Sequence, residues 1–225
     1  MRRDLLTALR AIVVVTVLFG LAYPLLVLGV GQLIFPGKAD GSLIHKDGVV
    51  VGSALIGQQF YEDVIGKNGK VEMSKGAPVT QPDPRYFQTR PSGTTPADNA
   101  AGSSFANYGP NSIITKQAIQ ANIAAYLALN TAPNKQLYDP AVTSAAQVPV
   151  DAADTSASGI DPDISVANAK IQAYRVATVR HLSLAEVDGL IAKYTTGRSL
   201  GFLGEPGVDV LELNLALDRI SNGSH

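Results

Sequence analysis

Residue types that perform chemistry are few and widely separated in this sequence. It has no cysteine, and its three histidines are His45, His181 and His225. None of them has an acidic residue or a second histidine at the helical spacing by which two side chains share a metal ion. The sequence also lacks a Walker-type phosphate loop and a Gly-x-Ser-x-Gly nucleophile motif. It therefore predicts neither a catalytic residue nor a metal site.

One passage has the composition of an anion-binding loop. Ser156 and Ser158 supply hydroxyl groups, Gly159 supplies a flexible backbone, and Ser165 is expected to cap a helix soon afterwards. Backbone N–H groups in such a loop can bind a phosphate. A tight turn that leads into the helix is the favoured interpretation, because no lysine or arginine follows closely. Ser156, Ser158 and Gly159 are kept as candidate anion ligands.

The elements that must position these residues begin with a long apolar segment. Residues 11–34 carry no charge, and Arg10 and Lys38 are the nearest charged residues on either side. About 20 residues in a helix cross the roughly 30 Å of hydrocarbon in a bilayer. The segment therefore predicts a single transmembrane helix.

The residues around this segment predict its orientation. Three arginines and only one acidic residue, Asp4, stand within residues 1–10. The positive-inside rule keeps such a basic flank in the cytoplasm, so the rest of the chain is expected outside. A cleaved secretory signal is the alternative, but the apolar core is too long for one and Gly37-Lys38-Ala39 is a poor cleavage site. An uncleaved anchor is predicted.

Small residues inside the apolar segment suggest a surface for helix packing. Thr16 and Gly20 are four positions apart and share one helix face, on which another helix could approach closely. Pro24 removes one backbone hydrogen bond and predicts a kink. Two interpretations stay open: a simple anchor, and a helix that packs on a partner helix through Gly20.

Residues 35–220 are predicted to form one extracytoplasmic α+β domain, with a small sheet and packed helices. Asp47-Gly48 lies between two apolar runs and predicts a β-hairpin. Capping residues and apolar periodicity predict three later helices that start near residues 112, 165 and 183. The nearly continuous apolar run at 208–217 is interpreted as a buried strand.

Other segments of the domain lack a strong pattern. Residues 64–85 mix Gly, Pro and charged residues without a sustained period, which predicts an insertion loop. Residues 86–90 are interpreted as a short strand. Residues 221–225 are expected to be a tail outside the domain, with a cloning remnant as one interpretation. The net charge of −1 and the pI near 6.3 provide no broad basic surface for nucleic acid.

A series of separated passages also follows the order found in one protein family. They are residues 41–44, 52–58 with Phe60, 86–92, 158–162, 172–177, 197–206 and 210–218. Together they resemble the C subunit of the Kdp-type potassium-transporting ATPase, from the membrane segment nearly to the end of the chain. Three features depart from the family: the long segment 64–85, Ala152-Ala153-Asp154 in place of what is commonly an apolar pair and threonine, and Asp163, which stands where the family often has histidine.

The resemblance implies a non-catalytic subunit of an inner-membrane complex. In that complex a polytopic subunit carries potassium and a P-type subunit hydrolyses ATP. The family is expected to assist assembly and to act as a catalytic chaperone that raises the ATP affinity of the hydrolysing subunit. The resemblance implies no firmly bound cofactor, and it makes ATP the candidate ligand of the 156–159 loop.

The predicted topology conflicts with direct ATP contact, because the domain is expected outside and ATP is cytoplasmic. An alternative therefore stays open, in which the domain stabilises or gates the outer mouth of the potassium-carrying subunit without touching nucleotide. Arg90 and Arg198 are the charged residues within the matching passages that we expect to contact a partner. A structural ion pair is the alternative role for each of them.

Overall fold

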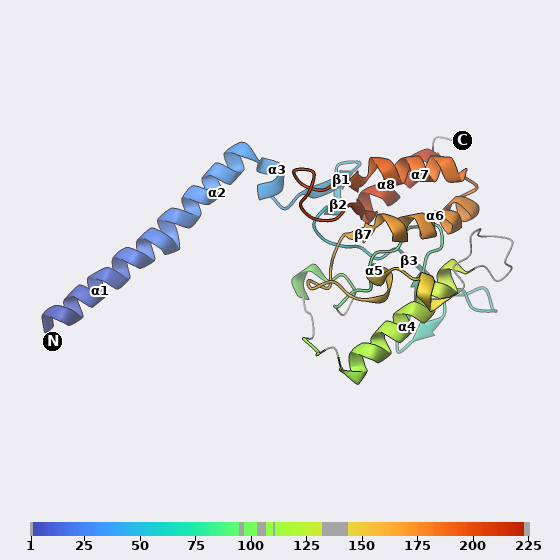
Figure 1. Cartoon of the computed structure of the whole chain (residues 1–225), viewed down its shortest axis with the longest axis horizontal. Coiled ribbons are helices and arrows are strands. Elements are labelled where there is room, and N and C mark those ends of the chain that lie inside the picture. The colour runs from blue at the N-terminus through green and yellow to red at the C-terminus, as the bar shows by residue number, and fades with distance from the viewer. Residues whose placement is uncertain (1, 95–96, 103–106, 110, 132–143, 223–225) are drawn as a thin grey trace. The chain divides into compact units, whose positions relative to one another are not determined.

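The computed structural model describes residues 2–94, 97–102, 107–109, 111–131 and 144–222. Within it the chain forms two compact units, Met1–Ser53 and Ala54–His225. Figure 1 shows the course of the chain through both units. The architecture is the predicted one, an N-terminal apolar helix followed by a mixed domain of helices and small sheets.

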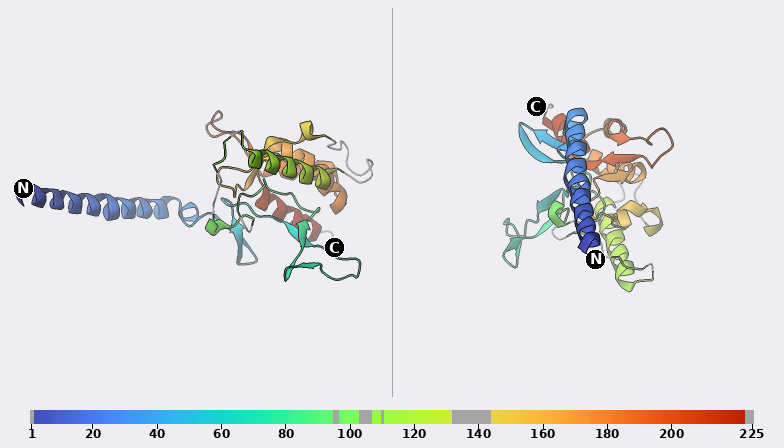
Figure 2. Two further views of the ribbon diagram at one scale, coloured as in Figure 1. Left: turned by 90° about the horizontal axis from the view of Figure 1, so that it is seen from below. Right: turned by 90° about the vertical axis from the view of Figure 1, so that its left-hand side faces the viewer.

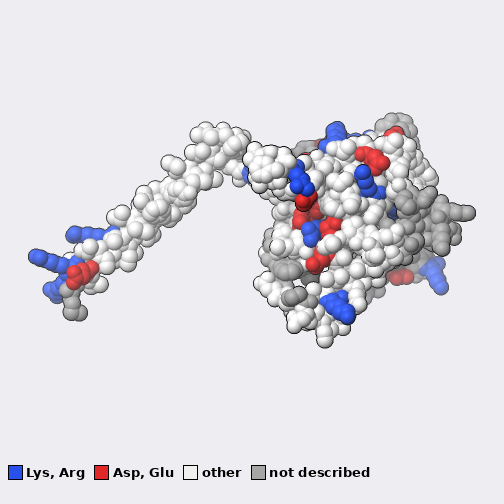
Figure 3. All heavy atoms as spheres, in the orientation of Figure 1, with Lys and Arg blue, Asp and Glu red and all other residues white. Residues whose placement is uncertain are grey.

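The first unit is dominated by one continuous apolar helix of 33 residues, Arg2–Ile34, none of which is buried. It consists of α1 (Arg2–Val17), a π-helical turn η1 (Leu18–Ala22) and α2 (Tyr23–Ile34). Its basic residues gather at the N-terminal end and the remainder is uncharged, as Figure 3 shows. The helix is long and apolar enough to cross a membrane, and it begins before the predicted start at residue 11.

The irregularity predicted at Pro24 takes the form of the π-helical turn. Proline lacks an N–H group, and its ring collides with the carbonyl of the residue four positions earlier, here Gly20. The wider turn at Leu18–Ala22 contains Gly20 and ends two residues before Pro24, where it can relieve this collision. Thr16 Cγ2 would lie 3.7 Å from a Cβ added at Gly20, so these two residues share a face as predicted.

A hairpin follows the helix, after the short α3 (Pro36–Ala39). Strands β1 (Leu43–Lys46) and β2 (Val49–Ser53) pair antiparallel. Asp47 and Gly48 both have positive φ, 52° and 79°, which is the conformation of a type I′ turn. The Asp-Gly signal is thereby confirmed.

Among its described residues the second unit holds three small sheets, all of them antiparallel. Residues 64–85, the predicted insertion, contain most of two of them. These pair β3 (Tyr61–Asp63) with β6 (Thr80–Pro82), and β4 (Met73–Ser74) with β5 (Ala77–Pro78). The third has the order β7-β9-β8 and consists of β7 (Asp163–Ser165), β9 (Gly207–Asp209) and β8 (Thr195–Thr196).

The second unit also contains helices. They are α4 (Ile113–Asn130), α5 (Val150–Ala153), α6 (Val166–Arg180), α7 (Leu184–Lys193) and α8 (Val210–Asn222), with the 3-10 turns η2 (Ala100–Gly102) and η3 (Ala145–Gln147). Ser112, Ser165 and Ser183 each accept a backbone N–H at the start of α4, α6 and α7. The three predicted N-caps are therefore confirmed.

The core lies where α6, α7 and α8 pack together over the three-stranded sheet. Figure 2 gives two further views of these helices. Their buried apolar side chains recur at helical spacing. They include Ala169, Ala173 and Val176 of α6, Val187 and Ile191 of α7, and Leu213 and Leu217 of α8, with Ile164 and Val208 from the sheet. The predicted apolar stripes of α6 and α7 are confirmed.

The strand predicted at 208–217 is wrong beyond its first two residues. The chain leaves β9 at Asp209, whose Oδ1 accepts the backbone N–H of Glu212 at 2.6 Å and so caps α8. An apolar run without clear alternation does not distinguish a buried strand from a buried helix. The Asp-x-x-Glu spacing was the available helix signal. Because α8 continues to Asn222, the first two residues of the predicted tail are helical, and residues 223–225 lie outside the described ones.

Candidate functional site

Residues 86–90 do not form the predicted strand, because their backbone pairs with side-chain amides. Phe87 N–H donates to Asn214 Oδ1 and Phe87 C=O accepts from Asn214 Nδ2, both at 2.9 Å. Gln88 N–H donates to Gln172 Oε1 at 2.8 Å and Gln88 C=O accepts from Gln172 Nε2 at 3.0 Å. Two helices thus replace the neighbouring strand that this segment would need.

Arg175 connects the same segment to two helices. Its side chain is completely buried. The guanidinium donates to Asn130 Oδ1 at 3.0 Å on α4 and to Gln172 Oε1 at 2.8 Å on α6. It also donates to the carbonyls of Pro84 and Tyr86. A planar group with five donors suits such a set of oxygens, which no lysine could satisfy together.

The side chain of Tyr86, the first residue of the 86–90 segment, packs between polar and aromatic neighbours. Its hydroxyl donates to Asp218 Oδ1 at 2.9 Å, and the Arg180 guanidinium lies over its ring at 4.5 Å from the centroid. Arg180 also pairs with Asp218 at 3.1 Å, and Phe60 stacks on the ring. Burial and the Asp218 carboxylate raise the pKa of Tyr86. The phenol is therefore held neutral as a hydrogen-bond donor.

Arg90, a predicted partner contact, binds the loop that contains the candidate anion site. Its Nη1 lies 3.4 Å from Asp161 Oδ2, and its Nη2 donates to the carbonyls of Thr155 at 3.2 Å and Asp154 at 3.5 Å. Only 24% of the side chain is exposed. These contacts favour the structural role for Arg90, with its guanidinium fastening residues 154–161 to the 86–92 segment.

The candidate anion ligands lie in a closed turn. Gly159, at a φ of 71°, donates its N–H to both Ser156 O and Ser156 Oγ at 3.1 Å. Ile160 N–H donates to Ser158 Oγ, and Ser92 Oγ donates to Gly159 O at 2.9 Å. Two amides that could bind a phosphate, those of Gly159 and Ile160, are thus already engaged, which favours the turn interpretation. A nucleotide contact at these residues would require the turn to open.

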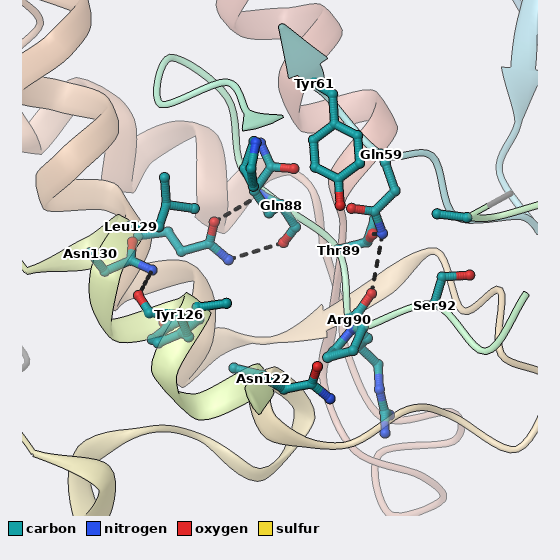
Figure 4. Close-up of a pocket in the computed structure, with 16 residues that line it drawn as sticks. Gln59, Tyr61, Gln88, Thr89, Arg90, Ser92, Asn122, Tyr126, Leu129 and Asn130 are labelled. Atoms are coloured by element: carbon teal, nitrogen blue, oxygen red, sulfur yellow. Dashed lines mark hydrogen bonds between the residues drawn. The ribbon is translucent and has the colours of Figure 1, made fainter. Parts of the chain in front are cut away.

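A cavity of about 270 Å³ separates the 82–92 segment from α4 (Figure 4). Several polar side chains on its walls form hydrogen bonds with other protein groups. Gln59 Nε2 donates to Thr89 Oγ1 at 2.7 Å, Asn122 Nδ2 to Ala153 O at 3.0 Å, and Tyr126 OH to Asn168 Oδ1 at 2.9 Å. Among the described residues no three His, Cys, Asp or Glu side chains are grouped to hold a metal ion.

The remaining two candidates lie elsewhere. Arg198 stands in the exposed loop between β8 and β9, where its Nη2 pairs with Glu205 at 2.7 Å. Gly20 belongs to the apolar helix of the first unit. The structure therefore brings together Arg90, Ser156, Ser158 and Gly159, and it places Arg198 in a separate loop.

Comparison with known proteins decides the family. The family model described as K+-transporting ATPase, c chain (KdpC) matches residues 5–219. The chain belongs to the KdpC family. Potassium-transporting ATPase KdpC subunits of Mycobacterium tuberculosis H37Rv and Methylococcus capsulatus are 44% and 47% identical to it, over 98% and 95% of this chain and 100% and 96% of those relatives. That of Herpetosiphon aurantiacus is 42% identical, over 99% of both chains.

Membership in the KdpC family confirms the resemblance seen in the sequence. It makes the chain an accessory subunit of the potassium-transporting ATPase and not its catalytic subunit. The KdpC-like passages prove to contain the buried polar network, namely Tyr86, Phe87, Gln88, Gln172, Arg175, Asn214 and Asp218. Sequence reasoning missed this network, although polar residues on otherwise apolar helix faces were a usable signal.

Alanine at Arg90 and at Arg198 is expected to have different effects in this KdpC chain. Arg90→Ala removes a half-buried group with three oxygen partners, so it should lower the free energy of unfolding by about 1–3 kcal/mol. Arg198→Ala removes an exposed ion pair and should cost less than about 1 kcal/mol. Thermal melting of the two full-length variants in detergent compares them. Equal melting temperatures would show that Arg90 is an ordinary surface charge.

Asp209 is expected to make the stability of the domain depend on pH. Burial raises the pKa of Asp209 to about 6, with further contributions from the Glu212 and Asp163 charges. Asp163 is its direct cross-strand partner, and burial raises the pKa of Asp163 as well. Because the folded state binds the proton more tightly than the unfolded state, this stabilisation is complete below pH 4 and is lost as the pH rises through about 6.

Asp209→Asn should therefore stabilise the chain at pH 7.5. The amide keeps an oxygen for the Glu212 N–H and removes the charge, which should be worth about 1 kcal/mol after allowance for solvent screening. Melting temperatures of wild type and variant between pH 4.5 and 7.5 provide the measurement. The gap between them should widen as the pH increases; a constant gap would refute the assignment.

Proposed function

We propose that this chain anchors in the inner membrane, assists assembly of the potassium-uptake complex and acts as a catalytic chaperone that raises the ATP affinity of the P-type subunit. Its proposed partners are that subunit, the polytopic potassium-carrying subunit and the lipid bilayer. The family match over residues 5–219 is the observation that carries the proposal. The apolar helix Arg2–Ile34 supports the anchoring role.

Protein contact is the route by which we expect the domain to act. The Gly159 and Ile160 amides already have partners within the protein, as do the cavity-lining side chains of Gln59, Asn122 and Tyr126. Two atoms of cavity-lining side chains, Gln88 Oε1 and Arg90 Nε, are buried without a hydrogen-bond partner among the described residues. A ligand would have to compete with these bonds, whereas a partner subunit could dock on the exposed loops. We therefore favour a chaperone role through contact with the P-type subunit over one through ATP contact at Ser156, Ser158 and Gly159.

The charges at the helix end favour an external domain. Arg2, Arg3 and Arg10 lie in the N-terminal part of the helix, ahead of its uncharged residues 11–34, which predicts a cytoplasmic N-terminus and an extracytoplasmic domain. In this orientation the domain would stabilise or gate the outer mouth of the potassium-carrying subunit and would not meet cytoplasmic ATP. This is the second candidate function.

Single cysteines in this cysteine-free chain distinguish the two functions. An impermeant thiol reagent applied to whole cells should label a cysteine at Lys46 and leave one at Thr7 unlabelled. Lys135 is a further predicted external site, outside the described residues. Labelling of Thr7 with protection of Lys46 would place the domain in the cytoplasm and restore direct ATP contact.

The chaperone role makes a separate kinetic prediction for the complex. Membranes that contain the two partner subunits should show a several-fold lower apparent KM for ATP when this chain is present. An unchanged KM with full potassium transport would eliminate the chaperone role and leave the assembly role.

Gly20→Leu is expected to weaken retention of the chain in the solubilised complex. The larger side chain obstructs close approach of another helix on the Thr16–Gly20 face, while membrane insertion persists because hydrophobicity rises. Gly29→Leu is the matched control, since nine positions at 3.6 residues per turn place Gly29 on roughly the opposite face. Equal co-purification of both variants would mean that Gly20 faces lipid.

A further inference from the structure

An exposed apolar tip projects between β8 and β9. Leu200, Phe202 and Leu203 are 83%, 68% and 50% exposed. No charged residue lies between Arg198 and Glu205. Grouped apolar side chains on a projecting loop indicate a contact surface, unlike the single exposed apolar residues that are common on proteins. We call residues 199–203 the apolar tip.

The apolar tip has a defined shape. Ser199 and Leu203 exchange both backbone hydrogen bonds, Ser199 N–H to Leu203 O at 2.8 Å and Leu203 N–H to Ser199 O at 2.9 Å. Leu200 and Gly201 adopt left-handed conformations, with φ of 53° and 82°. Such a conformation is costly for leucine, yet it directs this side chain outward. The Arg198–Glu205 ion pair closes the base of the loop.

Most backbone N–H groups of the apolar tip are hydrogen-bonded within the loop and so do not need water. The N–H groups of Ser199, Gly201, Phe202 and Leu203 all donate to carbonyls within residues 198–203. Each unsatisfied backbone group costs several kcal/mol in hydrocarbon, so internal bonding lowers the cost of leaving water. The ion pair at the base leaves the loop electrically neutral.

The position of the loop within the domain bears on which surface the apolar tip contacts. Strand β8, from which the loop begins, contributes Thr195 and Thr196 to a small hollow that is also lined by Ala54. Ala54 is the first residue of the second unit. It follows the β1–β2 hairpin, whose last residue Ser53 pairs with Leu43, nine positions after the apolar helix ends at Ile34. The loop therefore begins close to Ala54, the residue at which the second unit continues from the chain segment that carries the apolar helix.

We propose that the apolar tip inserts into the lipid interface of the bilayer on the domain's side of the membrane. Phe202 and Leu200 would enter the boundary between headgroups and acyl chains, and the Arg198–Glu205 pair would stay among the headgroups. Three acidic residues, Asp163, Asp209 and Glu212, and one basic residue, Lys193, line the neighbouring hollow, so attraction to anionic lipid is not the driving force. Insertion should therefore occur on zwitterionic lipid and be insensitive to salt. This inference does not depend on the chaperone role.

A single tryptophan tests the proposal, because the sequence contains none. Full-length Phe202→Trp, alone in phosphatidylcholine nanodiscs, should emit at shorter wavelength than an exposed tryptophan. Brominated phosphatidylcholine should quench it at least two-fold more strongly than it quenches a control, and aqueous iodide should quench it less. The control is Met73→Trp on the β4–β5 hairpin, where the native side chain is 60% exposed. In both views of Figure 2 this hairpin projects from a different side of the domain than the apolar tip does.

Two results would overturn lipid insertion. Equal quenching of both tryptophans by brominated lipid, with full access to iodide, would leave the tip in water. Protection of Phe202→Trp from iodide that appears only when the other subunits of the complex are added would identify a protein socket. Circular dichroism of both variants, matched to wild type, ensures that the comparison concerns folded protein.

Discussion

Replacing Arg175 by alanine is expected to lower the free energy of unfolding of the domain by about 3–5 kcal/mol. The guanidinium is completely buried and satisfies oxygens from three parts of the chain, on α4, on α6 and in the 84–86 segment. Its removal leaves a cavity and several buried acceptors without a donor. At about 2–4 °C per kcal/mol for a domain of this size, the melting temperature should fall by roughly 10 °C.

The measurement is chemical and thermal unfolding of the full-length chain in detergent, with the circular dichroism of the tyrosine side chains as the signal. Arg175→Lys should recover only part of the lost stability, because an ammonium group cannot reach the same set of oxygens. Arg198→Ala is the matched arginine control and should change little. A loss below about 1 kcal/mol for Arg175→Ala would mean that the polar network does not stabilise the domain.

The second large effect is expected for Gly57→Ala. A Cβ at this position would lie 2.7 Å from the backbone oxygen of Asp161, closer than real Cβ contacts occur. The neighbouring chain cannot simply turn away, because Gly57 N–H donates to Ile160 O at 2.8 Å. One methyl group should therefore displace the 157–161 loop and cost about 2–3 kcal/mol.

Gly189→Ala is the control for this substitution. Gly189 lies within α7, and nothing lies within 4 Å of its added Cβ. The same chemical change there should stabilise the helix by about 0.5–1 kcal/mol. Opposite signs for the two variants in one unfolding assay are the expected result. A neutral Gly57→Ala would show that the 157–161 loop shifts without cost.

The sequence predicted the parts of the fold that depend on local signals. Ser112, Ser165 and Ser183 cap helices where expected, and Asp47-Gly48 forms the expected turn. Each helix cap depends on residues about three positions apart, and the turn depends on two adjacent residues with left-handed backbone conformation. Local chemistry was sufficient there.

The sequence did not predict the features that depend on distant partners. Residues 86–90 have strand-like composition, but the amides of Gln172 and Asn214, far along the chain, bond their backbone. Burial of Arg175 depends in the same way on Asn130 and on the 84–86 carbonyls. For Arg90 the sequence leaves a partner contact and a structural ion pair open; the bonds of its guanidinium to the 154–161 loop favour the second, and no periodicity reveals this pairing.

The most direct test of the accessory role is potassium-stimulated ATP hydrolysis by membranes that contain the two proposed partner subunits, with and without this chain. Hydrolysis should lose its dependence on potassium when the chain is absent and should recover it when the full-length chain is co-expressed. Arg175→Ala, if it reaches the membrane, should recover less. Equal potassium-stimulated activity in membranes that lack the chain would contradict the accessory role.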